Sequence, residues 1–178
     1  MNGSGLDRHT GLEWAMNEYG TSIKRFIYSY VKNWETAGDL AQDVFVTVYE
    51  KWATFEGRSS FKTWIFTIAA NRSKDYLRSW HYRKISLSYS MADWGGSYDS
   101  AEAEVEQKEN VQAVLSVMMT LPVKYREILL LHHDQDLNYQ EMAEILSLPV
   151  STVKTRIRRG HEKVRKSFLP EHRGISHE

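Results

Sequence analysis

The stretch that decides the fold of this chain occupies residues 137–166 and reads LNYQEMAEILSLPVSTVKTRIRRGHEKVRK. Apolar residues recur there at helical spacing in two short runs. They are Met142, Ala143, Ile145 and Leu146 in the first run, and Val150, Val153, Ile157 and Val164 in the second. Each run can bury one face of a helix, and the two are separated by a tight turn. This arrangement is typical of a helix-turn-helix unit.

The second of these helices has a basic face opposite its apolar face. By the same spacing, the outward residues are Lys154, Thr155, Arg158, Arg159, Glu162 and Arg165. In a major groove, Arg and Lys read guanine edges, and further cations neutralise phosphates. The pattern therefore predicts a surface that binds duplex DNA.

Composition limits what else the chain can be. Its 178 residues are 42% hydrophobic, which suffices for one domain or two small ones. It contains no cysteine, so disulfides and thiolate metal sites are excluded. No apolar run is long enough to span a membrane, and residues 1–20 lack the pattern of a signal peptide. We therefore expect a cytoplasmic protein without membrane insertion.

Charge is distributed unevenly along the chain, although the net charge is zero. Residues 1–84 carry 12 basic and 9 acidic groups, residues 85–110 carry 1 and 6, and residues 111–178 carry 10 and 8. Two basic helical regions thus flank an acidic segment. A protein that holds DNA unaided normally needs an excess of Lys and Arg, so the neutral total favours one that binds DNA with a partner.

The predicted fold is all-α, with two small helical domains joined by a flexible acidic linker. No alternating strand pattern with hairpin turns occurs anywhere. Segment 86–104 is rich in Ser, Gly, Asp and Glu and can bury little. The expected boundaries are a first domain at 1–84, a linker at 85–109, a second domain at 110–170 and a tail at 171–178.

A second informative stretch, FKTWIFTIAANRSKDYLRSWHYRK, covers residues 61–84. Its apolar face comprises Trp64, Ile65, Ile68 and Ala69, and its polar, basic face comprises Thr67, Asn71, Lys74 and Arg78. Ser59 or Ser60 can cap this predicted helix. The rings around the preceding loop are Trp52, Phe55, Phe61, Trp64 and Phe66. They suit stacking on an extruded base, yet aromatic residues at helical spacing are also typical of a core.

Segment 36–52, TAGDLAQDVFVTVYEKW, places acidic and amide groups beside apolar ones. The carboxylates of Asp39 and Asp43 would repel DNA, and together with Gln42 they suit a protein partner with a basic surface. A solvated helix N-terminus explains Asp39 equally well. Pattern alone leaves these two interpretations open.

Four motifs in a fixed order now define a resemblance. They are DLAQDVF, FEGRSSFKTWIFTIAANRSKDYLR, LPVKYREILLL and LNYQEMAEILSLPVSTVKTRIRRGHEKVR, within about residues 15–168. In this order the chain resembles the extracytoplasmic-function (ECF) sigma factors, small bacterial initiation subunits of RNA polymerase. The resemblance implies core RNA polymerase and promoter DNA as partners, and commonly an anti-sigma factor. Catalysis would be left to the polymerase, so we expect no enzyme activity, cofactor or metal.

The resemblance also implies a role for each matching position. Core polymerase would bind Asp39, Leu40, Gln42, Asp43 and Phe45. Melted −10 DNA would bind Phe55, Arg58, Ser59, Ser60, Phe61, Lys62, Asn71, Arg72, Lys74 and Arg78, with a flipped base held by the loop and read by Asn71. The −35 duplex would bind Ser151, Thr152, Lys154, Thr155, Arg158 and Arg159. Acidic linker residues such as Asp99, Glu102 and Glu104 would run through the basic interior of the polymerase.

The chain departs from the family pattern at the helix-turn-helix. Many relatives have Gly where this chain has Ser147 and Ser151, so the turn must accept a residue with a Cβ. Arg158 stands at a position where residue type varies in the family. The sequence therefore predicts the fold of this unit but no promoter sequence.

Two other classes of protein compete with this interpretation. A free-standing helix-turn-helix regulator would explain residues 137–166 but leaves residues 36–78 unexplained. A metal-dependent nucleic-acid enzyme would use His132, His133, Asp134 and Asp136 as ligands. Adjacent His side chains diverge on a helix, so this second alternative is the weaker one.

Overall fold

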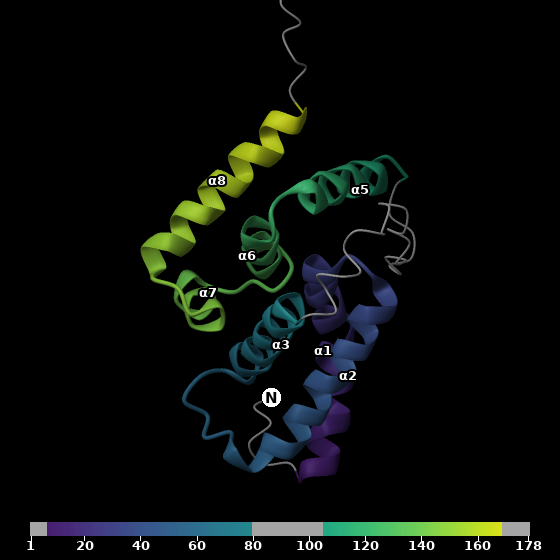
Figure 1. Cartoon of the computed structure of the whole chain (residues 1–178), viewed down its shortest axis with the longest axis vertical. Coiled ribbons are helices and arrows are strands. Elements are labelled where there is room, and N and C mark those ends of the chain that lie inside the picture. Colours follow the sequence, from purple (N-terminus) through teal and green to yellow (C-terminus); the bar gives the residue numbers. More distant parts are fainter. Residues whose placement is uncertain (1–6, 80–104, 169–178) are drawn as a thin grey trace, which may run out of the picture.

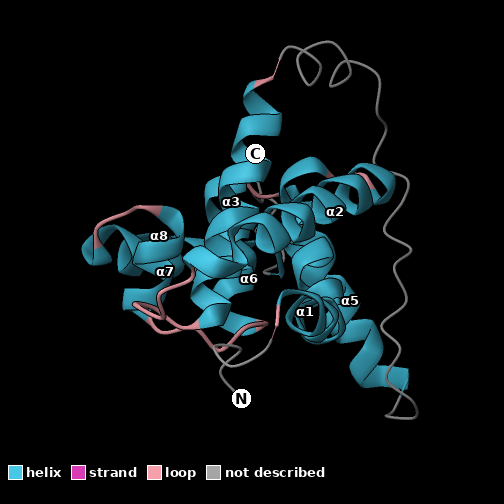
Figure 2. Cartoon of the chain, turned by 90° about the horizontal axis from the view of Figure 1, so that it is seen from below, coloured by secondary structure: helices cyan, strands magenta, loops and turns pink. Residues whose placement is uncertain are grey.

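The computed structural model describes residues 7–79 and 105–168, with side chains of the second range described from residue 113 onward. Its elements are α1 (Arg8–Val31), α2 (Trp34–Lys51), the 3₁₀ turn η2 (Trp52–Thr54), α3 (Phe61–Arg78), α5 (Val105–Thr120), α6 (Val123–His133), α7 (Tyr139–Leu146) and α8 (Val150–Phe168). Figures 1 and 2 show helices joined by short loops, with no strand in these two ranges. The all-α prediction is confirmed.

The N-terminal domain consists of α1, α2 and α3, which pack against one another. Side-chain caps set where these helices begin: Asp7 accepts from the backbone of His9 and Thr10, and Asn33 accepts from that of Thr36. Ser60 caps α3 by accepting from the Thr63 N–H at 3.0 Å, which decides between the two predicted caps. The fully buried side chains at the centre include Ile23, Phe26, Ile27, Tyr30, Val44, Val48, Ile65 and Phe66.

The C-terminal domain consists of α5, α6, α7 and α8. Helix α7 begins with a capping box, in which Asn138 and Glu141 satisfy each other's backbone N–H groups. It ends at Ser147, whose φ of 55° lies in the left-handed region. The predicted turn thus exists, and it holds a residue with a Cβ in a conformation that costs such residues free energy.

The predicted linker lies mostly outside the described residues. Helix α5 begins at Val105, so residues 105–109 belong to a helix and not to the linker expected at 85–109. Asp99, Glu102 and Glu104 are not among the described residues, nor is the tail at 171–178.

The two domains pack directly against each other, which the sequence did not predict. Helix α1 contacts α6, and α3 contacts α7. Figure 1 shows α7 beside α3 and α6 just above them, in agreement with these contacts. This arrangement brings residues of the two predicted DNA-binding regions into contact.

Within the described ranges, no helix has the length and apolar character needed to cross a membrane.

Candidate polymerase and nucleic-acid interfaces

Helix α2 separates its predicted site residues between two faces. Asp39 and Gln42 are exposed and Asp43 is half-buried, whereas Leu40 and Phe45 are only 6% and 7% exposed and point into the core. Leu40 and Phe45 therefore stabilise the helix that presents the polar residues.

Val46 completes this polar face, and sequence reasoning missed it. Its side chain is 56% exposed, which is uncommon for a valine at the middle of a packed helix. The signal was its position four residues after Gln42, which places both on one face. We define the α2 face as Asp39, Gln42, Asp43 and Val46.

One ion pair joins the α2 face to helix α3. Arg72 Nε donates to Asp43 Oδ2 at 3.1 Å, and Arg72 Nη2 contacts the same oxygen. Arg72 was predicted to support −10 DNA and Asp43 to bind polymerase. The two predicted surfaces are therefore contiguous.

The five rings predicted near the loop divide into core and surface. Phe66 is fully buried and packs edge-on against Phe26. Phe61 is 5% exposed, with the rings of Trp14, Tyr19, Trp52, Phe55 and Trp64 at centroid distances of 5.0–5.8 Å. Phe61 therefore packs among these rings and holds the loop in place. Neither face of its ring is free to stack on a base.

The remaining loop residues are accessible. Phe55 and Trp64 are half-buried. Their ring centroids lie 5.0 Å apart, and the ring planes are tilted by 38°. Ser59 is half-buried, and Arg58 is exposed beside Glu56 at 2.6 Å. The loop thus has an aromatic edge and a polar rim.

The polar face of α3 is partly covered by the C-terminal domain. Asn71 is exposed, and Arg78 lies 3.7 Å from Asp75 at the end of the helix. Lys62 Nζ donates to the Gln135 carbonyl at 3.1 Å, and Lys74 Nζ donates to the Leu146 carbonyl at 3.2 Å. Two predicted strand-binding lysines thus bind carbonyls of the other domain in this arrangement.

Helix α8 presents its predicted residues outward. Ser151, Lys154, Thr155, Arg158 and Arg159 are exposed and Thr152 is half-buried, while Val153 and Ile157 pack in the core. Arg158 forms an ion pair with Glu162 at 2.5 Å.

Tyr139 orients one of these side chains. Lys154 Nζ lies 5.5 Å from the centre of the Tyr139 ring. The predicted reading face of α8 is therefore accessible and partly ordered by neighbours.

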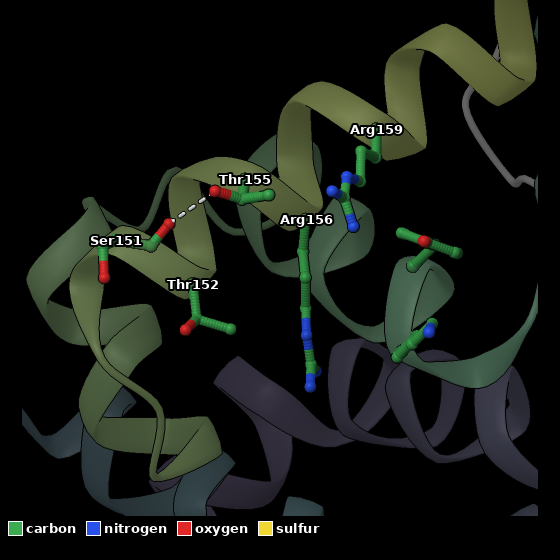
Figure 3. A pocket seen from close by; sticks show the side chains of 7 residues that line it. Ser151, Thr152, Thr155, Arg156 and Arg159 are labelled. Carbon is green, nitrogen blue, oxygen red and sulfur yellow. Dashed lines mark hydrogen bonds between the residues drawn. The ribbon is translucent and has the colours of Figure 1, made fainter.

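A cleft of about 280 Å³ lies beside the start of α8 (Figure 3). Its lining residues are Lys124, Tyr125, Ser151, Thr152, Thr155, Arg156 and Arg159. Lys124, Tyr125 and Arg156 were not among the predicted site residues. Lys124 lies two residues after Pro122, in the first turn of α6. Arg156 lies within a run of basic residues and next to the buried Ile157. Neither position has a sequence pattern that would indicate a binding site.

The histidines weighed as metal ligands lie at the end of α6. In the described part of the chain, no group of three or more His, Asp or Glu side chains is arranged to hold a metal ion. His133 Nε2 instead lies 2.7 Å from His161 Nε2 on α8, the distance of a hydrogen bond between neutral rings. Burial lowers the pKa of both rings, and the neighbouring His132 lowers them further.

Comparison with protein families locates two matching regions. Residues 15–82 match the family described as Sigma-70 region 2, and residues 111–164 match the family described as Sigma-70, region 4. The first match contains α2 and α3, and the second contains the helix-turn-helix.

Whole-chain relatives carry both regions. The chain is 32% identical to the ECF RNA polymerase sigma factor SigW of Bacillus subtilis, over 84% of each chain. It is 29% identical to the RNA polymerase sigma factor YlaC of the same organism, over 92% of this chain and 95% of that one.

Two solved structures share the fold. The sigma factor RpoE of Bartonella quintana, solved in complex with the anti-sigma factor NepR, matches with a TM-score of 0.70 and 20% identity over 86% of this chain and 94% of that one. CnrH in complex with the cytosolic domain of CnrY matches with a TM-score of 0.64 and 21% identity over 93% and 90%. With both regions present, in order, across nearly the full length of such relatives, this chain belongs to the ECF sigma factors of RNA polymerase.

Proposed function

We propose that this ECF sigma factor docks on core RNA polymerase through the α2 face and directs the polymerase to promoters. The face combines two carboxylates, an amide and the exposed Val46, a composition that suits a basic protein surface with an apolar spot. The same carboxylates disfavour DNA there. The relatives named above as RNA polymerase sigma factors support this assignment.

The melted −10 strand would bind along α3 and the loop before it. Asn71 has an amide that can donate to and accept from a base edge, and it is exposed. Phe55 and Trp64 have partly exposed rings on which a base can stack, and both rings pack against the buried Phe61. Lys62 and Lys74 would have to leave their carbonyl partners in the C-terminal domain before they could neutralise phosphates.

The −35 duplex would bind the exposed face of α8. Ser151, Thr152, Lys154, Thr155, Arg158 and Arg159 would supply base and phosphate contacts. The two domains would thus hold promoter DNA at two separate elements.

An anti-sigma factor is a further proposed partner. Two proteins of the same fold, RpoE and CnrH, were each solved with a partner chain, which for RpoE is an anti-sigma factor. We place the action of this chain in the cytoplasm with the polymerase, and we assign it no enzyme activity of its own.

The observation that carries the proposal is the contiguity of the α2 face with α3 through the Asp43–Arg72 pair. This pair supports the proposal because the surface proposed to bind protein lies directly beside the one proposed to bind the strand, as an initiation factor requires and a free-standing regulator does not. Run-off transcription with core polymerase on a promoter library, with and without this chain, tests it. New start sites sharing paired upstream elements are expected. Tight duplex binding without any new start would contradict the proposal.

A further inference from the structure

The cleft beside α8 has the chemistry of a phosphate site. Lys124, Arg156 and Arg159 line it together with four hydroxyl-bearing side chains, and no carboxylate is among its lining residues. Figure 3 shows Arg156 and Arg159 both extending downward from α8 in this view, as Thr152 does from the first turn. Cations and hydroxyls together are the groups that bind phosphate oxygens of a nucleic-acid backbone.

Two further features increase the positive potential at this cleft. Lys124 Nζ and Lys163 Nζ lie 5.3 Å and 5.6 Å from the centre of the Tyr125 ring, so a fourth cation stands close by. Helix α6, which carries Lys124, follows Pro122 at the N-cap and has neither a side-chain cap nor an acidic residue in its first turn. Its N-terminus therefore contributes the positive end of a helix dipole.

Arg156 is already engaged inside the protein. Its Nη1 lies 2.9 Å from Glu127 Oε1, and the two side chains are only 25% and 6% exposed. The other oxygen of Glu127 accepts a hydrogen bond of 2.6 Å from the hydroxyl of Tyr30 on α1. Tyr30, Glu127 and Arg156 thus form one chain of contacts that runs from the N-terminal domain to the cleft.

A phosphate in the cleft would compete with Glu127 for the same guanidinium. If Arg156 turned to the phosphate, the buried Glu127 carboxylate would lose the cation that pairs with it. A buried and unpaired charge is strongly unfavourable, and moving α1 away from α6 would return Glu127 to water. Phosphate binding and domain separation are therefore linked through one side chain.

We propose that the cleft binds a backbone phosphate of duplex DNA through Lys124, Arg156 and Arg159, and that this binding takes Arg156 from Glu127 and loosens the contact between the two domains. The inference rests on the proposed −35 role of α8. By linkage, whatever separates the domains also raises affinity for the duplex. Separation also frees Lys62 and Lys74, so −35 docking prepares the −10 surface.

Affinity measurements on the full chain test the site itself. The probe is a fluorescent duplex carrying the −35 element found by run-off transcription. Lys124→Gln should weaken binding at least fivefold and reduce the salt dependence by about one phosphate contact. Lys166→Gln, which removes an exposed cation of α8 outside the cleft, is the matched control. Equal effects of the two substitutions would overturn the assignment.

Glu127→Gln tests the competition for Arg156. The amide can still accept from Tyr30 but no longer holds Arg156 by charge, so affinity for the duplex should rise severalfold. Unchanged or weaker binding by a folded Glu127→Gln chain would overturn the shared role of Arg156.

Distance measurements test the link to domain separation. Because the chain contains no cysteine, Thr21→Cys and Glu144→Cys introduce two exposed label sites, one in each domain. Spin labels there should move apart when duplex is added to the otherwise unaltered chain. Inorganic phosphate replacing chloride at constant ionic strength should have no such effect. Separation by phosphate alone would assign the cleft to a free anion and overturn the DNA assignment.

The outcomes distinguish failure of this inference from failure of the proposed function. If the unaltered chain neither binds duplex nor starts transcription, the proposed function is wrong. If it does both and Arg158→Ala weakens binding, while labels stay at a fixed distance, only the inference is wrong.

Discussion

The hydroxyl of Tyr30 donates to Glu127 Oε2 at 2.6 Å, across 97 positions of sequence and between two domains. Both residues are buried, at 1% and 4% exposure of the whole residue. Burial raises the pKa of Tyr30 well above its ordinary value, and the negative charge of Glu127 raises it further. The tyrosine therefore stays protonated and acts as the donor.

Removal of this donor should destabilise the domain interface. Tyr30→Phe leaves Glu127 with one hydrogen bond fewer in a buried position, which costs about 1–3 kcal/mol. Chemical denaturation of the full chain measures the loss. Tyr49→Phe is the control, because the Tyr49 hydroxyl bonds to His9 at the surface. Equal stabilities of the two variants would contradict a stabilising role for the Tyr30–Glu127 hydrogen bond.

Replacing two glycines of α1 by alanine should change the stability of the protein in opposite directions. A Cβ at Gly11 would overlap the ring of Trp52, whereas Gly20 has open space around it. Gly11→Ala should lower the melting temperature and disturb the Trp52 and Phe61 rings below the loop, at a cost of about 1–3 kcal/mol. Gly20→Ala should stabilise by roughly 0.5–1 kcal/mol, since alanine favours a helix. A melting curve for each variant decides the matter.

Stability should fall at mildly acidic pH. The pKa values of His133 and His161 lie below the ordinary 6.5, so near that pH the unfolded chain binds protons that the folded chain excludes. Their contribution is complete above pH 6.5 and is lost as the pH falls from there toward the folded pKa values. Because both rings are partly exposed, the loss should stay under about 1 kcal/mol.

Melting temperature measured against pH checks this expectation. His161→Gln should flatten the decline, while His9→Gln, exposed on α1, should leave it intact. A decline of equal steepness in His161→Gln would mean that other groups cause it.

The exposed Val46 offers a separate test of the polymerase interface. Val46→Lys should weaken binding to core polymerase by about 1–3 kcal/mol, since it places a like charge against a basic partner. The fold should be unaffected, because the side chain already faces solvent. Met16→Lys, also at an exposed apolar position, is the control in the same binding assay. If Val46→Lys bound the polymerase with unaltered affinity, the α2 face would not be part of the polymerase interface.

Asn71 should be needed for opening DNA more than for assembly. Asn71→Ala removes the only amide on the exposed face of α3 and should reduce promoter opening about fivefold or more, as expected for a lost base contact of ~1 kcal/mol. Permanganate footprinting measures opening, and a binding assay measures polymerase affinity. Loss of affinity with normal opening would reverse the assignment of α3.

The helices and their inward faces could be predicted from sequence because apolar spacing determines both. The residues that the pattern places inward are buried, namely Met142, Ala143, Ile145, Leu146, Val153 and Ile157, and Val150 is partly buried. Family motifs, in contrast, name whole segments, so Leu40, Phe45 and Phe61 were assigned to binding although they pack in the core. Within α2, helical spacing separates Leu40 and Phe45 from Val46.

The packing of one domain on the other could not be predicted. It depends on single contacts such as Lys74 with the Leu146 carbonyl, in which a side chain meets backbone far away in sequence. No periodic pattern records such a pair. Arg156 was missed for the same reason, since its partner Glu127 lies on another helix.

The contacts between the two domains join residues far apart in sequence, and this affects how the chain folds while the ribosome makes it. Helices α1, α2 and α3 complete their own core within residues 7–79, whereas the partners of Lys62 and Lys74 are residues 135 and 146. At about 5–20 residues per second, the ribosome needs roughly 3–13 s to reach Leu146 after it passes residue 79. During each round of translation, we therefore expect the nascent N-terminal domain to fold with its lysines uncovered, before the second half of the chain emerges.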